Sequence, residues 1–415
     1  MSKIRGWLIL ITISVSNVVS TRAQADLSFA SAVDLAQHNA AELSVLDANI
    51  DAARANALAA GRLPDPKLAV GIENLPATGD DQWRVSRDFM TMRRVGVMQE
   101  FPGYGKRQAQ REVATAVVEQ SQSERRAKVL IVRRAAATAW IERYYLEHRL
   151  TLLDELDHEN QLFAAVVNAQ LMSGKSKPVD ILMPQQEAAE LADRRDELQA
   201  LLAKTTAELR RWVGEVADHP LVGDLPGFNI DAAQLREHVH AHPELAVYKP
   251  MMQVAQAELH EAQADKHPDW GVELFYSKRA AAYGDMVSLQ FTVGLPIFSA
   301  HRQEPLISAK RQLVQRVMAE REQMFREHLQ EFENDIAEYQ NLSHQSTRIA
   351  EVKIPLAKQK VELQFAAYQA GRIELAELIA ARRELIEEKF KLLQVGSMRT
   401  ISMAKLYFMT EEGLQ

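Results

Sequence analysis

Cysteine is absent from all 415 residues of the sequence. Disulfide bonds, thiolate metal sites and a cysteine nucleophile are therefore excluded. A cysteine-free chain of this length also suits an oxidising compartment, where free thiols are a hazard. The formal net charge is −7, and because neutralising phosphates requires a basic surface, we expect no nucleic-acid partner.

After its N-terminus, the sequence also lacks any stretch that approaches the roughly 20 apolar residues of a transmembrane helix. At the N-terminus itself, Lys3 and Arg5 precede a short apolar run, and the A-x-A triplet at 23–25 is typical of a cleavage site. We predict that residues 1–25 are a secretory signal that is removed on export, with an uncleaved anchor as the alternative. An exported chain of this kind would have to meet a membrane through β-strands.

Catalytic motifs are a third absence. The sequence contains no nucleophile–base pair, no phosphate-binding loop and no dinucleotide-binding fingerprint. We therefore predict that the protein is not an enzyme and that it uses no cofactor.

What the sequence does contain is an internal repeat, with an offset of roughly two hundred residues. Five segments recur in the same order, and the last of them pairs residues 169–182 with residues 368–379. In each copy we expect a helix, two strands, a very long helix, a turn and a long returning helix. The predicted domains are a first repeat, a linker rich in Gly, Pro and Asp, and a second repeat, at 26–213, 214–231 and 232–415.

The helices are predicted from long runs without helix breakers. Residues 106–173 contain neither Gly nor Pro, which predicts a helix about 100 Å long. Residues 306–370 contain one proline, Pro355, where we expect a kink or a local repair of the helix. The returning helices are predicted at 178–213 and 372–410, and the second has a seven-residue apolar repeat typical of coiled coils.

Four segments alternate apolar and polar residues with period two, which is the pattern of strands with one apolar face. Their lengths suit tilted transmembrane strands. Two soluble hairpins packed on the helices are the alternative. The apolar positions are Leu68, Val70 and Ile72; Val95 and Val97; Trp270, Val272, Leu274 and Tyr276; and Val287, Leu289, Phe291, Val293 and Leu295.

Four strands in lipid would require an oligomer. They cannot close a barrel, and an open strand edge in hydrocarbon leaves unpaired amides that cost several kcal/mol each. Outer-membrane barrels have even strand numbers from about eight upward, and three copies would supply twelve strands. Two copies would give eight, but would leave few long helices around the axis. We therefore predict a mainly α fold with a small β part, as a homotrimer with a 12-stranded barrel and a helical tunnel.

This combination resembles the TolC-like outer-membrane efflux proteins. The resemblance covers residues 26–415 and rests on three features. They are the duplicated pattern, the PDP and HPD motifs before strands, and the acidic residue after each hairpin glycine. The stretches LPDPKLAVGIENLP (63–76) and DFMTMRRVGVMQEFP (88–102) are similar to the heavy-metal branch, the partners of copper, silver or cobalt-zinc-cadmium exporters. The resemblance implies a passive trimeric duct in a Gram-negative outer membrane. It would extend into the periplasm and dock with a periplasmic adaptor and an inner-membrane, proton-driven pump of the RND type.

The resemblance also implies roles for residues near the hairpin turns. Glu377 falls on a family aspartate position in a periplasmic gate, and Asp180 is its equivalent in the first repeat. The second family aspartate is Ala380 here, and Glu374 is the expected substitute. Three copies of Glu377 around an axis would concentrate cations, and an ordinary solvated charge is the alternative. The tips that would contact the adaptor are Gly174, Ser176, Gly371 and Arg372.

Two groups of residues are candidate metal ligands. Met90 and Met92 stand two residues apart before a strand, and paired thioethers suit Cu(I) or Ag(I); a role as filler is the alternative. His238, His240 and His242 form the second group, because positions 238 and 242 would share one face of a helix, as in a zinc pair. The aligned segment of the first repeat keeps only one histidine, so the architecture does not require this group.

Two functions follow from these patterns. The first is the outer-membrane channel of a tripartite efflux system that exports heavy-metal cations such as copper or silver. The second is a periplasmic coiled-coil scaffold or adaptor whose strands are soluble. The sequence leaves open which ion or compound would be exported.

Overall fold

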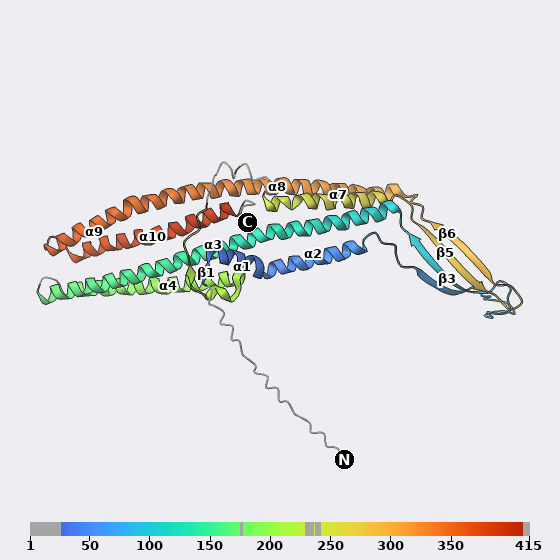
Figure 1. Ribbon diagram of the computed structural model, residues 1–415, viewed down its shortest axis with the longest axis horizontal. Helices are drawn as coiled ribbons and strands as arrows, with labels where there is room; N and C mark the ends of the chain where they lie inside the picture. The colour runs from blue at the N-terminus through green and yellow to red at the C-terminus, as the bar shows by residue number, and fades with distance from the viewer. Residues whose placement is uncertain (1–25, 175–176, 229–235, 237–241, 410–415) are drawn as a thin grey trace, which may run out of the picture.

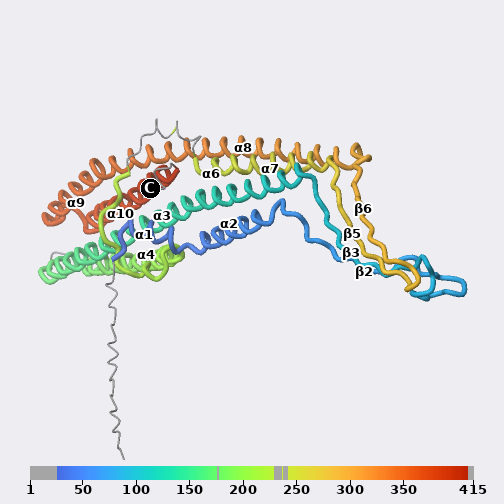
Figure 2. Tube along the Cα trace, turned by 45° about the vertical axis from the view of Figure 1, so that its right-hand side comes forward, coloured from blue at the N-terminus to red at the C-terminus, as the bar shows by residue number. Residues whose placement is uncertain are grey.

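The protein is an elongated molecule in the computed structural model, which describes residues 26–174, 177–228, 236 and 242–409. A long body of helices carries a small β-sheet that bends away at one end, and two helical hairpins end at the other (Figures 1 and 2). This confirms a mainly α fold with a small β part. The predicted signal peptide lies outside the described residues. None of the helices described combines the length and the apolar character needed to cross a membrane.

The first part of the chain contributes four helices to the body. They are α1 (Phe29–Asn39), α2 (Ala41–Ala59), α3 (Tyr104–Met172) and α4 (Leu182–Val213). Ser28 caps α1, because its hydroxyl oxygen accepts the N–H of Ser31 at 3.2 Å. Helix α3 has 69 residues and is therefore about 100 Å long, which confirms the prediction from its lack of Gly and Pro. A short 3₁₀ helix at Pro178–Ile181 precedes α4.

The second part of the chain contributes α6 (Pro243–Ala246), α7 (Tyr248–Ala264), α8 (Ser299–Arg348), α9 (Ile354–Gln369) and α10 (Leu375–Tyr407). A π-helical segment, Ile349–Lys353, joins α8 to α9 just before Pro355. Proline has no N–H to donate, and a wider π turn accommodates the missing bond without ending the helix. The expected local repair at Pro355 is confirmed. Helix α8 starts earlier than predicted and contains Pro305 near its beginning.

The helices pack around α3, which contacts α2, α4, α7 and α10. The largest apolar core surrounds Trp140 of α3, which is fully buried, and draws side chains from α1, α4 and α10. Smaller clusters continue toward the hairpin ends, where Ile386 packs on Leu153 and Leu378 packs near Phe163. Because Leu378 and Ile386 belong to the seven-residue repeat of α10, the predicted apolar seam is buried against α3.

The predicted linker, 214–231, contains regular structure in its described part. A 3₁₀ helix (Gly214–Asp218) and strand β4 (Leu221–Val222) lie within it, and β4 pairs in parallel with strand β1 (Leu27–Ser28). The buried guanidinium of Arg143 donates hydrogen bonds to two carbonyl oxygens of this segment. The role of this segment as the linker between two repeats stays a prediction, and its described part packs on partners that lie far away in the sequence.

The four longer strands form one antiparallel sheet in the order β2-β3-β5-β6. They are β2 (Lys67–Glu73), β3 (Met92–Phe101), β5 (Trp270–Lys278) and β6 (Met286–Val293). All four predicted strands are confirmed. Strand β6 ends at Val293, so Leu295 lies beyond it, contrary to the prediction. The sheet therefore unites two strand pairs that are distant in sequence.

Candidate functional sites on the sheet and at the hairpin tips

One face of the four-stranded sheet is apolar and exposed. The register places Val97 opposite both Leu68 and Leu274, and Leu274 opposite Leu289. Val97, Leu274 and Leu289 are 51%, 54% and 59% exposed. A contiguous exposed apolar surface is typical of a membrane or protein interface. The apolar face comprises the exposed residues Leu68, Val70, Ile72, Val95, Val97, Trp270, Leu274, Tyr276, Val287, Leu289, Phe291 and Val293.

The opposite face of the sheet carries small and polar residues and three methionines around one aromatic ring. Phe275 is only 5% exposed and lies so close to Gly96 that a Cβ there would sit 2.1 Å from the ring. The guanidinium of Arg94 lies 3.5 Å from the centre of the same ring and forms an ion pair with Glu73 at 3.0 Å. The alternation in the sequence did not identify this cluster around Phe275, because the contacts of the cluster depend on the register between β2, β3 and β5.

Both outer strands of this sheet have an unpaired edge. Among the residues that the structure describes, strand β2 pairs with β3 alone, and β6 pairs with β5 alone. Edge N–H and C=O groups need water or a further strand as partners. In lipid, the sheet would therefore be incomplete.

The two hairpin tips lie side by side at the end of the body opposite the sheet (Figures 1 and 2). Gly174 and Gly371 both have φ +70, the left-handed conformation that ends a helix and that glycine adopts at least cost. After α9, the N–H of Arg372 donates to the carbonyl of Ala367 and that of Gly371 to the carbonyl of Tyr368, both at 2.9 Å. The predicted positions of both turns are therefore confirmed.

An ion pair joins the two tips. The Nζ of Lys177 lies 2.8 Å from Oε1 of Glu374, and hydrogen bonding to this carboxylate raises the pKa of Lys177. The backbone N–H of Lys177 also donates to Oδ2 of Asp180 at 2.8 Å. Two of the acidic residues predicted for a gate thus have structural partners. Lys177 was not singled out from the sequence, since its contact crosses between hairpins.

Glu377 differs from these two carboxylates. It is exposed in the first turn of α10, and within the described residues it forms no ion pair. With Lys177, Asp180 and Glu374 it lines an open pocket of about 580 Å³ between the tips. Gly371 and Arg372 are exposed beside it, whereas Ser176 lies outside the described residues. The roles of these residues in gating and in adaptor contact stay predictions.

The methionine pair lies where the sheet begins. Met92 is the first residue of β3, opposite Glu73, and Met90 is exposed in the preceding loop, where its N–H donates to Asp88 Oδ1 at 2.6 Å. A contact of these thioethers with a metal ion stays a prediction.

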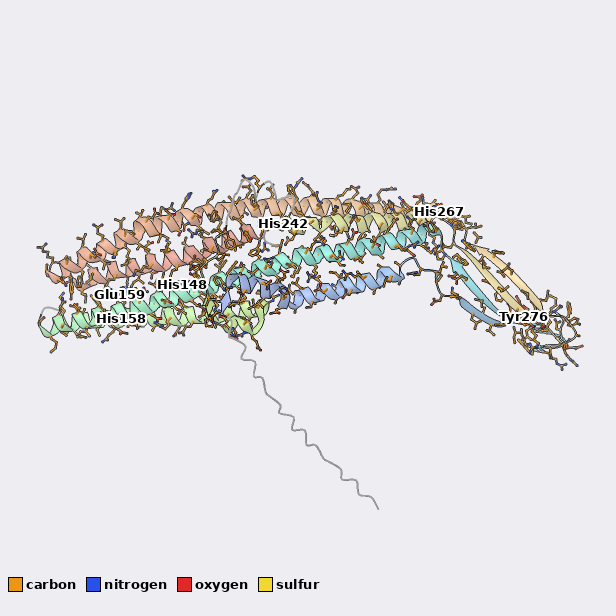
Figure 3. All side chains as sticks on the ribbon, in the orientation of Figure 1. His148, His158, Glu159, His242, His267 and Tyr276 are labelled. Atoms are coloured by element: carbon orange, nitrogen blue, oxygen red, sulfur yellow. The ribbon has the colours of Figure 1, made fainter. Side chains whose placement is uncertain are left out.

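Of the three predicted histidines, His238 and His240 lie outside the described residues. His242 is buried just before α6, and its ring lies 4.2 Å, centre to centre, from the ring of His328 in α8. Figure 3 shows His242 midway along the helical body, far from the sheet. His328 was missed in the sequence, because no local spacing relates it to His242.

This arrangement of long helical hairpins and a four-stranded sheet is the fold of outer-membrane channels. It is similar to the structure of CusC, a protein described as forming a transmembrane channel, with a TM-score of 0.76 and 16% identity over 93% of this chain and 92% of that chain. It is also similar to a membrane protein from Pseudomonas aeruginosa, with a TM-score of 0.78 and 15% identity over 92% of this chain and 91% of that one.

A third similar structure is the open state of the MtrE outer-membrane channel of Neisseria gonorrhoeae. The TM-score is 0.74 and the identity is 15%, over 100% of this chain and 99% of that chain. At identities this low the similarity is one of fold. No protein-family model and no curated protein matches the sequence.

Proposed function

We propose that the protein is the outer-membrane channel of a tripartite, RND-type efflux system, assembled from three copies of the chain. The observation that carries the proposal is the exposed apolar face of the sheet, because such a surface is more stable in lipid than in water. Three sheets joined edge to edge would make a closed barrel of twelve strands, with each β2 edge paired to a β6 edge of a neighbour. The opposite face, with Arg94 and Glu73, would line an aqueous interior.

The helical body would continue the duct into the periplasm of a Gram-negative cell. Helix α3 alone extends about 100 Å from the sheet. The hairpin tips lie at its far end (Figure 1), where they would dock with a periplasmic adaptor and an inner-membrane, proton-driven pump. In this function the protein is a passive duct, and the pump supplies the energy.

The experiment that tests the channel is extraction and assembly of the native protein. We expect it to stay in the membrane fraction after carbonate treatment and to have the mass of three chains in mild detergent. Release into the soluble fraction as a single chain would contradict the channel and support a periplasmic scaffold.

For the cargo we propose heavy-metal cations such as copper or silver. The support is the resemblance of residues 63–76 and 88–102 to the heavy-metal branch. Deletion of the gene is expected to raise the sensitivity of the host to Cu(I) or Ag(I) salts, measured as a lower inhibitory concentration. Loss of resistance to dyes and antibiotics alone would contradict the metal cargo while leaving the channel intact.

Glu377 provides a test of the proposed gate. We expect Glu377→Ala to raise the ion conductance of the trimer in planar bilayers several-fold, because three carboxylates that share bound cations would hold the aperture closed and their removal would open it. The matched control is Glu362→Ala, which removes an exposed carboxylate of α9 away from the tips. Equal conductance in both variants and the wild type would remove Glu377 from the gate.

A further inference from the structure

Three side chains with metal-binding atoms converge midway along the helical body. His242 precedes α6, Glu244 lies in its first turn, and His328 lies on α8. One ligand atom from each lies within 4.8 Å of the others. Nε2 of His328 lies 3.1 Å from Oε2 of Glu244. The group thus connects two segments that are more than eighty residues apart in the sequence.

The burial of this group is unusual for polar side chains. His242 and His328 are each 7% exposed, whereas the side chain of Glu244 is 28% exposed and leaves an opening to water. Nε2 of His328 has the carboxylate of Glu244 as its partner, with Oε2 3.1 Å away. A metal ion bound by both atoms would replace this direct contact.

We propose that His242, Glu244 and His328 bind a divalent transition-metal ion of the zinc type. Two imidazoles and one carboxylate are a common ligand set for Zn²⁺, with water in the fourth position. Two ligands of a tetrahedral zinc lie about 3.4 Å apart, so the His328–Glu244 separation already fits and His242 needs a small movement. The absence of sulfur ligands disfavours Cu(I) and Ag(I), which prefer thiolates and thioethers. The site is therefore not one for the copper or silver named above as cargo.

A second carboxylate lies near the ring of His328. Oε2 of Glu331 lies 3.8 Å from Nδ1 of His328, on the opposite side of the ring from Glu244. At 3.8 Å this contact is too long for a hydrogen bond. With a metal on Nε2, the carboxylate would favour the proton on Nδ1. Such carboxylate–histidine–metal arrangements also fix the orientation of the ring.

His242 must give up one hydrogen bond to bind the ion. Its Nδ1 accepts the N–H of Glu244 at 3.2 Å and so caps α6, and a metal would either take Nδ1 or require the proton to move there from Nε2. This bond is single and long, so its loss is small beside a metal–imidazole bond.

The test is metal binding by the purified trimer, prepared without a polyhistidine tag and stripped with a chelator. We expect one Zn²⁺ per chain by calorimetry, a rise in the thermal unfolding midpoint with Zn²⁺, and the intense visible absorption of four-coordinate Co²⁺. His328→Ala should weaken Zn²⁺ binding by more than about 100-fold. This exceeds the 10–100-fold loss of metal affinity that is typical when a residue hydrogen-bonded to a metal ligand is removed. Glu244→Gln should remove the Co²⁺ absorption while preserving the size of the side chain.

Two controls separate this site from other histidines. His344→Ala, on the same helix as His328, should leave binding unchanged. The double variant His238→Ala/His240→Ala should also bind one Zn²⁺ per chain, and its failure to do so would overturn the assignment. Undiminished Zn²⁺ binding in His328→Ala, or no binding by the wild-type trimer, would equally overturn it. None of these results depends on whether the trimer conducts ions.

Discussion

Leu289→Arg is expected to abolish stable assembly in the membrane. Leu289 is the middle of the exposed apolar face of β6, opposite Leu274, and would lie near the centre of the bilayer in the proposed barrel. An arginine on the lipid face of an outer-membrane barrel costs about 2–4 kcal/mol near the midplane, and each trimer carries the substitution three times. The measurement is the amount of trimer recovered from the outer-membrane fraction.

The matched control is the next residue along the same strand. Gln290 is also exposed, lies on the opposite face and pairs with Glu273, so Gln290→Arg should assemble like the wild type. The comparison separates the outer-membrane channel from the periplasmic scaffold, because both positions face water if the strands are soluble. Equal recovery of the two variants would therefore contradict a lipid-facing sheet.

Trp140→Ala is expected to destabilise the helical body by about 3–5 kcal/mol, the range for deleting a large buried ring. Trp140 is fully buried, stacks on Tyr144 with ring centres 5.4 Å apart, and meets Phe29 edge-on at 5.5 Å. Its indole N–H also donates to the carbonyl of Leu27 at 3.0 Å, which ties strand β1 to α3. We expect a large drop in the thermal unfolding midpoint, compared at one scan rate because large proteins often unfold irreversibly.

Trp140→Phe is the control for this substitution. It keeps an aromatic ring in the core and removes the hydrogen bond to Leu27, so the loss should be smaller, about 1–2 kcal/mol. If Trp140→Ala unfolds at the same temperature as Trp140→Phe, the ring is not the centre of the core.

Much of the fold was predictable from the sequence because its signals are local. Alternation along β2, β3, β5 and β6 predicted four strands, and the absence of helix breakers predicted α3. The turn glycines Gly174 and Gly371 were predicted from their place after long helices, where a left-handed residue is needed. The repair at Pro355 followed from its missing N–H. The division into two repeats, the trimer and the gate stay predictions.

The errors have a common origin. The second long helix was predicted from residue 306 onward, but α8 begins at Ser299 and contains Pro305. Leu295 continued the alternation, but β6 ends at Val293, where its partner strand β5 begins at Trp270. The short strand within 214–231 was not predicted, because its partner strand is near the other end of the first repeat. For both strands a neighbour in space, not in sequence, decided the outcome.

The sequence by itself determined the lengths of the helices, the alternation of the strands and the positions of the hairpin turns, since each depends on the conformational preferences of consecutive residues. Only the tertiary structure decided which side chains meet. It brought Lys177 to Glu374, closed Phe275 over Gly96, and placed His328 beside His242. These contacts depend on helix packing and strand register, which are set by the burial of apolar surface over the whole molecule.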